Sequence, residues 1–242
     1  MKQRLDLLIA ERGLAPSRER ARALVLAGQV TVNGAVVTKA GTPVAPDAVV
    51  ALATPDHPYV GRGGVKLAHA LDHFGIGVQD REALDIGAST GGFTDVLLRR
   101  GAARVVALDV GHGQIDWRLR NDPRVLVIEG LNARYLTPSD IPGPVDLVTI
   151  DVSFISLTQV LPRVPPVLRP GADIVALVKP QFEAGRREVR KGIVHDPEVH
   201  ARVVERVTQA AEFLGLRSRG MTPSPITGAE GNREFLLHLQ NP

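Results

Sequence analysis

Short apolar runs alternate with amphipathic segments from residue 83 onward. Runs of this length indicate strands that are buried on both faces, and the segments between them have the spacing of helices or loops. The order predicts an α/β fold with a doubly wound, Rossmann-like sheet of parallel strands. The predicted strands cover residues 83–87, 104–109, 125–129, 145–151, 173–178, 216–219 and 234–239, and a long helix covers 198–214.

The first fifty residues follow a different pattern. Apolar residues at helical spacing predict one helix within Leu5–Gly13 and a second within Ser17–Gly28, with the serine as N-cap and each glycine as a C-terminal cap. The segment Val30–Val37 reads as a hairpin, because Asn33-Gly34 supplies the two residues with positive φ that a type I′ turn needs. This is a small α+β module.

Prolines concentrated in residues 41–60 indicate a stiff domain boundary. We expect a small domain over residues 1–56, a linker over 57–64 and the α/β domain over 65–242. A chain of 242 residues with 44% hydrophobic content can bury the cores of one large and one small domain.

Composition excludes several classes of function. No apolar run has the roughly 18 residues needed to span a bilayer, and Asp6, Glu11 and Arg12 interrupt the only leader-like segment. The absence of cysteine excludes disulfides, thiolate metal sites and a cysteine nucleophile. We therefore expect a cytoplasmic protein that does not associate with membranes.

The basic charge is concentrated near the N-terminus. Residues 1–50 hold seven Lys or Arg against four Asp or Glu, which accounts for the whole net charge of +3. A basic small module suggests a polyanionic partner, although a solvated helix face explains many such charges.

The pattern Asp85-x-Gly87-x-x-x-Gly91-Gly92 ends one predicted strand and opens a helix. Its spacing differs from the G-x-G-x-x-G of dinucleotide sites, so NAD is the less favoured ligand. Asp85 can accept from a ligand ammonium and Asp109, at the end of the next strand, from ribose hydroxyls; both groups occur in S-adenosylmethionine. The expected cofactor contacts are Asp85, Gly87, Ala88, Ser89, Thr90, Gly91, Gly92, Phe93, Asp109, Val110, Asn132 and Asp151.

Two further polar residues follow apolar strands. Asp151 and Lys179 end the fourth and fifth strands, where ligands of parallel sheets bind. Methyl transfer to a ribose 2′-hydroxyl needs a base within hydrogen-bond reach, and a lysine amine can serve when desolvation or a second cation favours its neutral form. Lys66 can supply the second positive charge, and Asp151 and Glu234 the orienting carboxylates.

The N-terminal module resembles the S4 RNA-binding domain. The matching positions are Arg4-Leu5-Asp6, Gly13-Leu14-Ala15, Ser17-Arg18 and Gly28-x-Val30-x-Val32-Asn33-Gly34. The resemblance implies that the second helix and the hairpin lie on structured RNA and contact its backbone. The candidate RNA-binding residues, each of which could instead only solubilise the surface, are Arg4, Arg18, Arg20, Arg22 and Arg62.

Nearly the whole chain resembles the TlyA family, RNA 2′-O-methyltransferases with an S4 domain joined to an FtsJ-type domain. The matching motifs are Gly61-Arg62-Gly63-Gly64-x-Lys66-Leu67, Asp85-x-Gly87-Ala88-Ser89-Thr90-Gly91-Gly92-Phe93-Thr94, Asp109-Val110-Gly111, Asp151-Val152-Ser153-Phe154-Ile155-Ser156, Val178-Lys179-Pro180-Gln181-Phe182-Glu183 and Gly231-Asn232-x-Glu234. The resemblance implies a Lys-Asp-Lys-Glu tetrad at Lys66, Asp151, Lys179 and Glu234.

The family also implies cytidine methylation in ribosomal RNA with S-adenosylmethionine as donor, and some members carry the name haemolysin. Because the chain stops at Pro242, it resembles the shorter members, which act on the large subunit; the expected partner is 23S rRNA or the 50S subunit.

Several other residues have two readings. Arg186, Arg187, Arg190 and Lys191 form a basic loop for RNA contact or for solvation. Phe154 and Phe182 could stack on a flipped base, although core packing is the commoner role of phenylalanine. His69 and His73 lie four apart on a helix but lack a third nearby ligand, so we expect no metal site.

Two other functions remain open from the sequence. One is a non-catalytic RNA-binding or ribosome-assembly factor, although such a factor gains nothing from charged residues at strand ends. The other is an NAD-dependent oxidoreductase. The sequence does not determine the oligomeric state.

Overall fold

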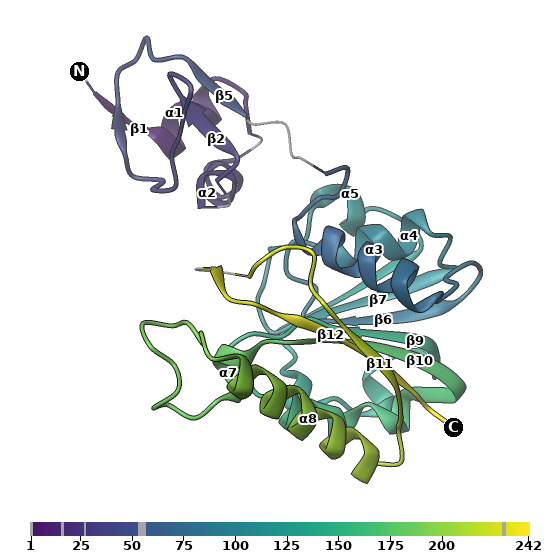
Figure 1. Ribbon diagram of the computed structural model, residues 1–242. Coiled ribbons are helices and arrows are strands. Elements are labelled where there is room, and N and C mark those ends of the chain that lie inside the picture. The colour runs from purple at the N-terminus through teal and green to yellow at the C-terminus, as the bar shows by residue number, and fades with distance from the viewer. Residues whose placement is uncertain (1, 16, 27, 53–56, 229–230) are drawn as a thin grey trace. The chain divides into compact units, whose positions relative to one another are not determined.

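The computed structural model describes residues 2–15, 17–26, 28–52, 57–228 and 231–242. The chain divides into two compact units, Met1–Pro58 and Tyr59–Pro242 (Figure 1). Each unit has its own buried hydrophobic residues. The boundary expected at residue 56 lies outside the described residues.

The first unit packs two helices against short strands. Asn33 and Gly34 have φ values of +50° and +83°, which is the turn predicted for the hairpin. Both predicted helices are present, and Ser17 caps the second by accepting from the Arg20 amide at 3.2 Å. The elements are β1 (Gln3–Arg4), α1 (Leu5–Glu11), α2 (Arg18–Leu26), β2 (Val30–Val32), β3 (Ala35–Val36), β4 (Pro43–Val44) and β5 (Val50–Leu52).

The second unit alternates strands and helices. Its helices are α3 (Gly63–Phe74), α4 (Gly92–Arg99), α5 (Trp117–Arg120), α6 (Leu157–Val160), α7 (Pro180–Glu183) and α8 (Pro197–Phe213), with 3₁₀ turns η1 (Ala133–Tyr135), η2 (Pro138–Asp140), η3 (Leu161–Arg163) and η4 (Pro165–Val167). Its strands are β6 (Glu82–Ile86), β7 (Arg104–Asp109), β8 (Val125–Glu129), β9 (Val145–Ile150), β10 (Leu168–Val178), β11 (Arg217–Pro223) and β12 (Phe235–Gln240).

The described strands of this unit form one sheet in the order β11-β12-β10-β9-β6-β7-β8. The five strands from β6 to β10 are parallel, as predicted, whereas β12 runs antiparallel to both β10 and β11. The chain leaves β6 toward β7 on one side and later adds β9 and β10 on the other. The order therefore reverses between β6 and β9, and ligands of such sheets bind at this position, beyond the carboxyl ends of the strands.

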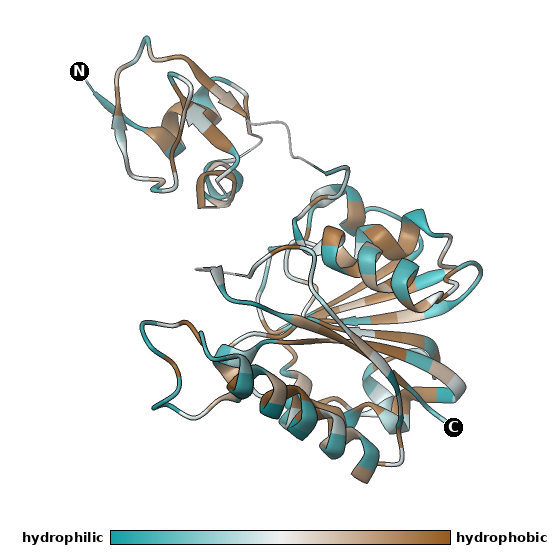
Figure 2. Cartoon of the chain, viewed as in Figure 1, coloured by the Kyte–Doolittle hydropathy of each residue, from teal (hydrophilic) through white to brown (hydrophobic). Residues whose placement is uncertain are grey.

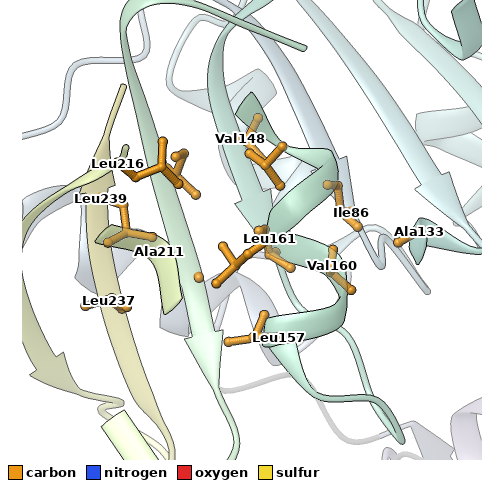
Figure 3. Close-up of a cluster of buried hydrophobic side chains, with 14 of the residues drawn as sticks. Ile86, Ala133, Val148, Leu157, Val160, Leu161, Ala211, Leu216, Leu237 and Leu239 are labelled. Carbon is orange, nitrogen blue, oxygen red and sulfur yellow. The ribbon is translucent and has the colours of Figure 1, made fainter. Parts of the chain in front are cut away.

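Helices cover both faces of the sheet (Figure 1). Leu84 and Ile86 of β6 point into a core formed with α6 and α8, and Ala83 points into a second core formed with α3 and α4. Figure 3 shows Ile86 and Val148 of the sheet facing Leu157 and Val160 of α6. Burial on both faces explains why the central strands are continuous apolar runs, which Figure 2 shows as hydrophobic.

Among the described residues, no helix is both long enough and apolar enough to cross a membrane.

Candidate active site

The turn after β6 is pressed against the end of β9. Gly87 has φ of +87°, and a Cβ at this position would lie 2.3 Å from the carbonyl oxygen of Asp151. Both conditions require glycine. The close approach places the glycine-rich turn next to the first residue beyond β9.

Two adjoining cavities lie at this edge of the sheet. The larger has a volume of about 530 Å³, within the usual range for small-molecule sites, and the smaller about 190 Å³. They share Gly87, Ser89, Asp151 and Ser153 in their walls. One elongated ligand could therefore extend through both.

Most of the expected cofactor residues line these cavities. The larger contains Gly87, Ser89, Asp109, Val110, Asn132 and Asp151, and the smaller contains Gly87, Ala88, Ser89, Thr90, Gly92, Phe93 and Asp151. Gly91 lines neither; it precedes α4 with φ of +95° and lies against Leu119.

The Asp109 carboxylate is held in a fixed orientation in the larger cavity. Its Oδ2 accepts from the Ser89 amide at 2.8 Å and its Oδ1 from the Gly111 amide at 2.7 Å. Each carboxylate oxygen can accept a further hydrogen bond, so Asp109 can still bind ribose hydroxyls. Asn132 caps η1 by accepting from the Arg134 amide at 3.1 Å, the turn-forming role that an asparagine in a loop often has.

The Asp85 carboxylate, expected to bind a ligand ammonium, is fully buried and lines neither cavity. The Thr94 and Thr149 hydroxyls donate to its two oxygens at 2.7 and 2.9 Å. Burial, together with the nearby Asp151 carboxylate, raises the pKa of Asp85 to about 6, although hydrogen bonds from the two hydroxyls oppose the shift. Its surroundings make Asp85 a support of the turn, with no surface open to a ligand.

The four residues of the expected tetrad form two ion pairs. Lys66 Nζ lies 2.5 Å from Glu234 Oε2, and both side chains are almost fully buried. Lys179 Nζ lies 2.6 Å from Asp151 Oδ1. Buried or partly buried charges are costly unless they are paired, and these pairs satisfy that requirement.

The strand register brings the two pairs together. Val178 of β10 pairs with Phe235 of β12, and the next residue on each side, Lys179 and Glu234, follows this last pair of the antiparallel ladder. Ile150 of β9 pairs with Ala176 of β10, which places Asp151 at the same edge. Lys66 and Glu234 line neither cavity, whereas Lys179 and Asp151 line the smaller one.

The ammonium of Lys179 has a second partner that was not among the expected site residues. Lys179 Nζ donates to Ser153 Oγ at 2.8 Å. Its contact with Asp151 Oδ1 is close but is not a directed hydrogen bond, and that oxygen, buried, has no hydrogen-bond donor among the described residues. Ser153 lines both cavities, and its position two residues beyond a predicted strand end was the available signal.

Phe154 lines the larger cavity and forms an aromatic pair with Phe182. Phe154 is 90% exposed with φ of +63°, and its ring centroid lies 5.0 Å from that of Phe182. The commoner expectation of core packing is therefore wrong for Phe154. A bulky residue in this backbone region is strained, and such strain is typical of functional positions. Gln114 and Arg134 also line this cavity, in loops without a sequence signal.

The candidate RNA-binding arginines differ in their surroundings. Arg4 Nε and Nη2 donate to the two Asp6 oxygens at 3.0 and 2.9 Å, and Arg18 Nε donates to Oδ2 at 3.2 Å. Arg20 is half-buried, whereas Arg22 and Arg62 are exposed. Asp6 therefore makes ion pairs with two of the five candidate arginines, Arg4 and Arg18.

The basic loop after α7 ends in a tight turn. Arg190 and Ile193 exchange backbone hydrogen bonds of 2.9 and 3.0 Å, and Lys191 has φ of +50°. The side chains of this loop are exposed to solvent: Arg186, Arg187, Arg190 and Lys191.

The two histidines on α3 are stacked with ring centroids 5.8 Å apart. His69 contacts Thr222 at 3.3 Å, and across the described parts of the chain no three His, Cys, Asp or Glu residues are grouped as metal ligands.

Comparison with known proteins gives two family matches. The model of the FtsJ-like methyltransferase matches residues 59–241, and that of the S4 domain matches residues 3–50. The 16S/23S rRNA (cytidine-2′-O)-methyltransferase TlyA of Mycobacterium tuberculosis is 50% identical over 98% of this chain and 89% of that protein.

Two further relatives differ in coverage. The 23S rRNA (cytidine-2′-O)-methyltransferase TlyA of Campylobacter jejuni is 34% identical over 74% of this chain and 70% of that protein. A solved structure from Streptococcus thermophilus, described as a candidate hemolysin, is 45% identical with a TM-score of 0.79, covering 99% of this chain and 88% of that one.

Proposed function

We propose that this chain, which belongs to the TlyA family of FtsJ-like methyltransferases with an N-terminal S4 domain, methylates the 2′-hydroxyl group of a cytidine in ribosomal RNA. Its methyl donor is S-adenosylmethionine. The observation that carries the proposal is the Lys179–Asp151 pair in the wall of the smaller cavity, next to the buried Lys66–Glu234 pair.

The residues present fit the donor. The larger cavity offers the oriented Asp109 carboxylate for ribose hydroxyls, and the smaller has a wall of glycine and other small side chains. When bound, S-adenosylmethionine supplies an electrophilic methyl group on a sulfonium. Residues that would hold it are Gly87, Ala88, Ser89, Thr90, Asp109, Val110 and Asn132.

Lys179 is the proposed general base. In its neutral form, the Lys179 amine accepts the proton of the 2′-hydroxyl while the ribose oxygen forms its bond to the methyl carbon. The products are a 2′-O-methylated ribose, the demethylated thioether and a protonated Lys179. Asp151 makes an ion pair with the Lys179 amine. Lys66 and Glu234 form a second ion pair, whose opposite charges add no net charge to the site.

The proposed target is the large-subunit RNA. Both relatives named above carry 23S in their names, and the more similar one also carries 16S. The exposed Arg22 and the Arg4 and Arg18 side chains of the S4 unit support RNA binding, because phosphate contacts dominate the affinity of such proteins. We therefore propose 23S rRNA within the 50S subunit as a substrate.

The test is methyl transfer from labelled S-adenosylmethionine to unmodified ribosomal subunits. We expect Lys179→Ala and Lys179→Arg each to lose at least about 10²-fold in rate, because arginine keeps the charge but cannot act as the base. Mapping of 2′-O-methyl groups would identify the subunit and nucleotide.

Absence of transfer to any RNA, with RNA still bound, would favour the non-catalytic RNA-binding factor. Calorimetry with NAD would test the oxidoreductase.

A further inference from the structure

The Lys179 amine is held by two oxygen atoms at once. Asp151 Oδ1 lies 2.6 Å from Nζ and Ser153 Oγ lies 2.8 Å from it. Both partners follow β9, and the Lys179 side chain is only 11% exposed. Few directions therefore remain for a substrate to approach this amine.

A tetrahedral amine nitrogen has three positions besides its bond to Cε. One position is directed to Ser153 and the Asp151 carboxylate lies beside the nitrogen, so a further position is left for the smaller cavity, whose wall Lys179 helps to form. In the neutral amine, one N–H group can point to Ser153 Oγ and the other can lie on the side of the Asp151 carboxylate, while the lone pair occupies the third position. A base must direct its lone pair at the proton that it removes.

Asp151 alone would not determine this orientation. Its Oδ1 makes an ion pair with Nζ whose angle is not that of a hydrogen bond, so the contact supplies charge with little directional preference. The contact with Ser153 does meet hydrogen-bond geometry. The hydroxyl is therefore the group that fixes rotation about the Cε–Nζ bond.

We propose that Ser153 is a positioning residue for catalysis: it accepts a hydrogen bond from Lys179 and aims the lone pair of the amine at the 2′-hydroxyl. The proposal rests on the function proposed above. Lys66 differs in this respect, because its Nζ donates to Glu234 at 2.5 Å and it lines neither cavity. The contact with Ser153 distinguishes the base from the other lysine of the tetrad.

Hydrogen bonds to the Glu183 side chain hold the loop that carries Ser153. The loop that carries it is tied to α7, the helix that directly follows Lys179, through Glu183. Ser156 Oγ and the Leu157 amide both donate to the Glu183 carboxylate at 2.6 Å. Lys179 and Ser153 therefore belong to two segments linked by one buried and one partly buried hydrogen bond, which is the support that a positioning contact needs.

The test compares Ser153→Ala with Ser153→Thr in the full chain, using labelled S-adenosylmethionine and ribosomal subunits. We expect Ser153→Ala to lower kcat about 10-fold or more, with KM for the cofactor and the RNA within about 3-fold of the unchanged chain, and the threonine hydroxyl to restore most of the loss. Ser139→Ala, which removes an exposed hydroxyl outside both cavities, is the matched control and should leave kcat unchanged.

The pH profile separates positioning from a structural role. A hydrogen bond from the ammonium to Ser153 favours the charged amine, so its removal should move the acidic limb of the kcat profile to lower pH. A general structural defect would lower kcat at every pH without moving the limb. Two results would overturn the proposal. One is a Ser153→Ala variant whose kcat and acidic limb of the pH profile equal those of the unchanged chain. The other is an equal loss of kcat in the alanine and threonine variants together with weaker cofactor binding.

The same assay distinguishes the two levels of inference. If the unchanged chain transfers methyl groups and Lys179→Ala does not, while Ser153→Ala behaves as the unchanged chain, only the role of Ser153 is refuted. If the unchanged chain transfers no methyl group to any RNA, the proposed function fails, and the role of Ser153 fails with it.

Discussion

The Asp85 carboxylate is buried where sequence reasoning expected it to meet a ligand. The difference has a physical cause: β6 is covered on both faces, so the side chain preceding its last residue points into the unit. Thr94 of α4 and Thr149 of β9 then satisfy its oxygens. Because the pKa of Asp85 rises to about 6 from an ordinary 3.8, the folded chain binds this proton more tightly than the unfolded chain.

We predict that Asp85→Asn flattens the dependence of stability on pH. The ionised, buried carboxylate costs stability as the pH rises from about 4 through 6, on the order of 2 to 3 kcal/mol in full, and the amide removes this cost while still bonding both hydroxyls. Denaturant unfolding at pH 5 and pH 8 measures it. We expect the variant to gain relative to the unchanged chain at both pH values, by about twice as much at pH 8 as at pH 5.

Asp80→Asn is the control, because it removes the same charge from an exposed side chain. Equal pH dependence in the Asp85 variant and the unchanged chain would show that Asp85 titrates as an ordinary acid.

Residue type and position predicted many of the residues that meet at the two cavities, but not the direction of each side chain. The glycines around Gly87 and the strand-end residues Asp109, Asp151 and Lys179 were identified because strand ends share one edge of a parallel sheet. Ser153 was missed as an individual residue because its role depends on a hydrogen bond formed only after folding. The exposure of Phe154 depends on a left-handed backbone that no local pattern indicates.

At the scale of elements, the β6–α4 turn depends on close approach of two backbones. We predict that Gly87→Ala destabilises the chain by about 3 kcal/mol or more, because the new Cβ would meet the Asp151 carbonyl at 2.3 Å and φ is +87°. It should also displace Asp151 and so reduce methyl transfer. Thermal unfolding and cofactor calorimetry are the measurements.

Gly77→Ala is the matched control, since its Cβ would meet no atom within 4 Å and no positive φ opposes the change. We expect it to leave stability unchanged or to raise it by up to about 1 kcal/mol. Similar losses in both variants would mean that the turn is not held by the contact at Gly87.

The pattern of apolar and polar residues predicted some strands more accurately than others. The strands 104–109 and 125–129 were predicted at the observed bounds, because both faces of the sheet are buried and the apolar runs are continuous. The strands β1 and β4 have two residues each and offer no period to detect. The antiparallel direction of β12 depends on the connection after β11, where the chain reverses and places β12 between β10 and β11, and the residue pattern of β12 does not indicate this.

Asp6 connects the start of α1 to Arg4 and to Arg18 at the start of α2. The hydrogen bonds from Arg4 lower the pKa of Asp6 to about 2, so its contribution to stability is complete above about 4 and is lost as the pH falls toward 2. We predict that Asp6→Asn costs on the order of 1 kcal/mol at pH 7, since both guanidinium groups are half-exposed and screened by solvent. Chemical denaturation at pH 7 and pH 2.5 should show the difference shrinking.

At the scale of the whole molecule, charge and chemistry belong to different units. Residues 1–50 hold the entire net charge of +3, whereas both cavities and both lysine–carboxylate pairs lie within Tyr59–Pro242. An excess of positive charge attracts a polyanion at long range, and its contribution weakens as salt concentration rises. RNA affinity and cofactor affinity should therefore respond to different substitutions.

Arg22→Ala tests this division, because Arg22 is exposed on α2 and has no ion-pair partner among the described residues. We predict that the variant binds ribosomal RNA more weakly and that the slope of log affinity against log salt falls by about 0.7 to 0.9 for one lost phosphate contact. S-adenosylmethionine affinity should not change. Arg104→Ala, an exposed arginine at the amino end of β7, should alter neither quantity. If Arg22→Ala kept the full salt slope, the arginine would serve solubility. The RNA contacts would then fall to the other candidates of this unit, Arg4, Arg18 and Arg20, and Asp6 already offsets part of the charge of the first two.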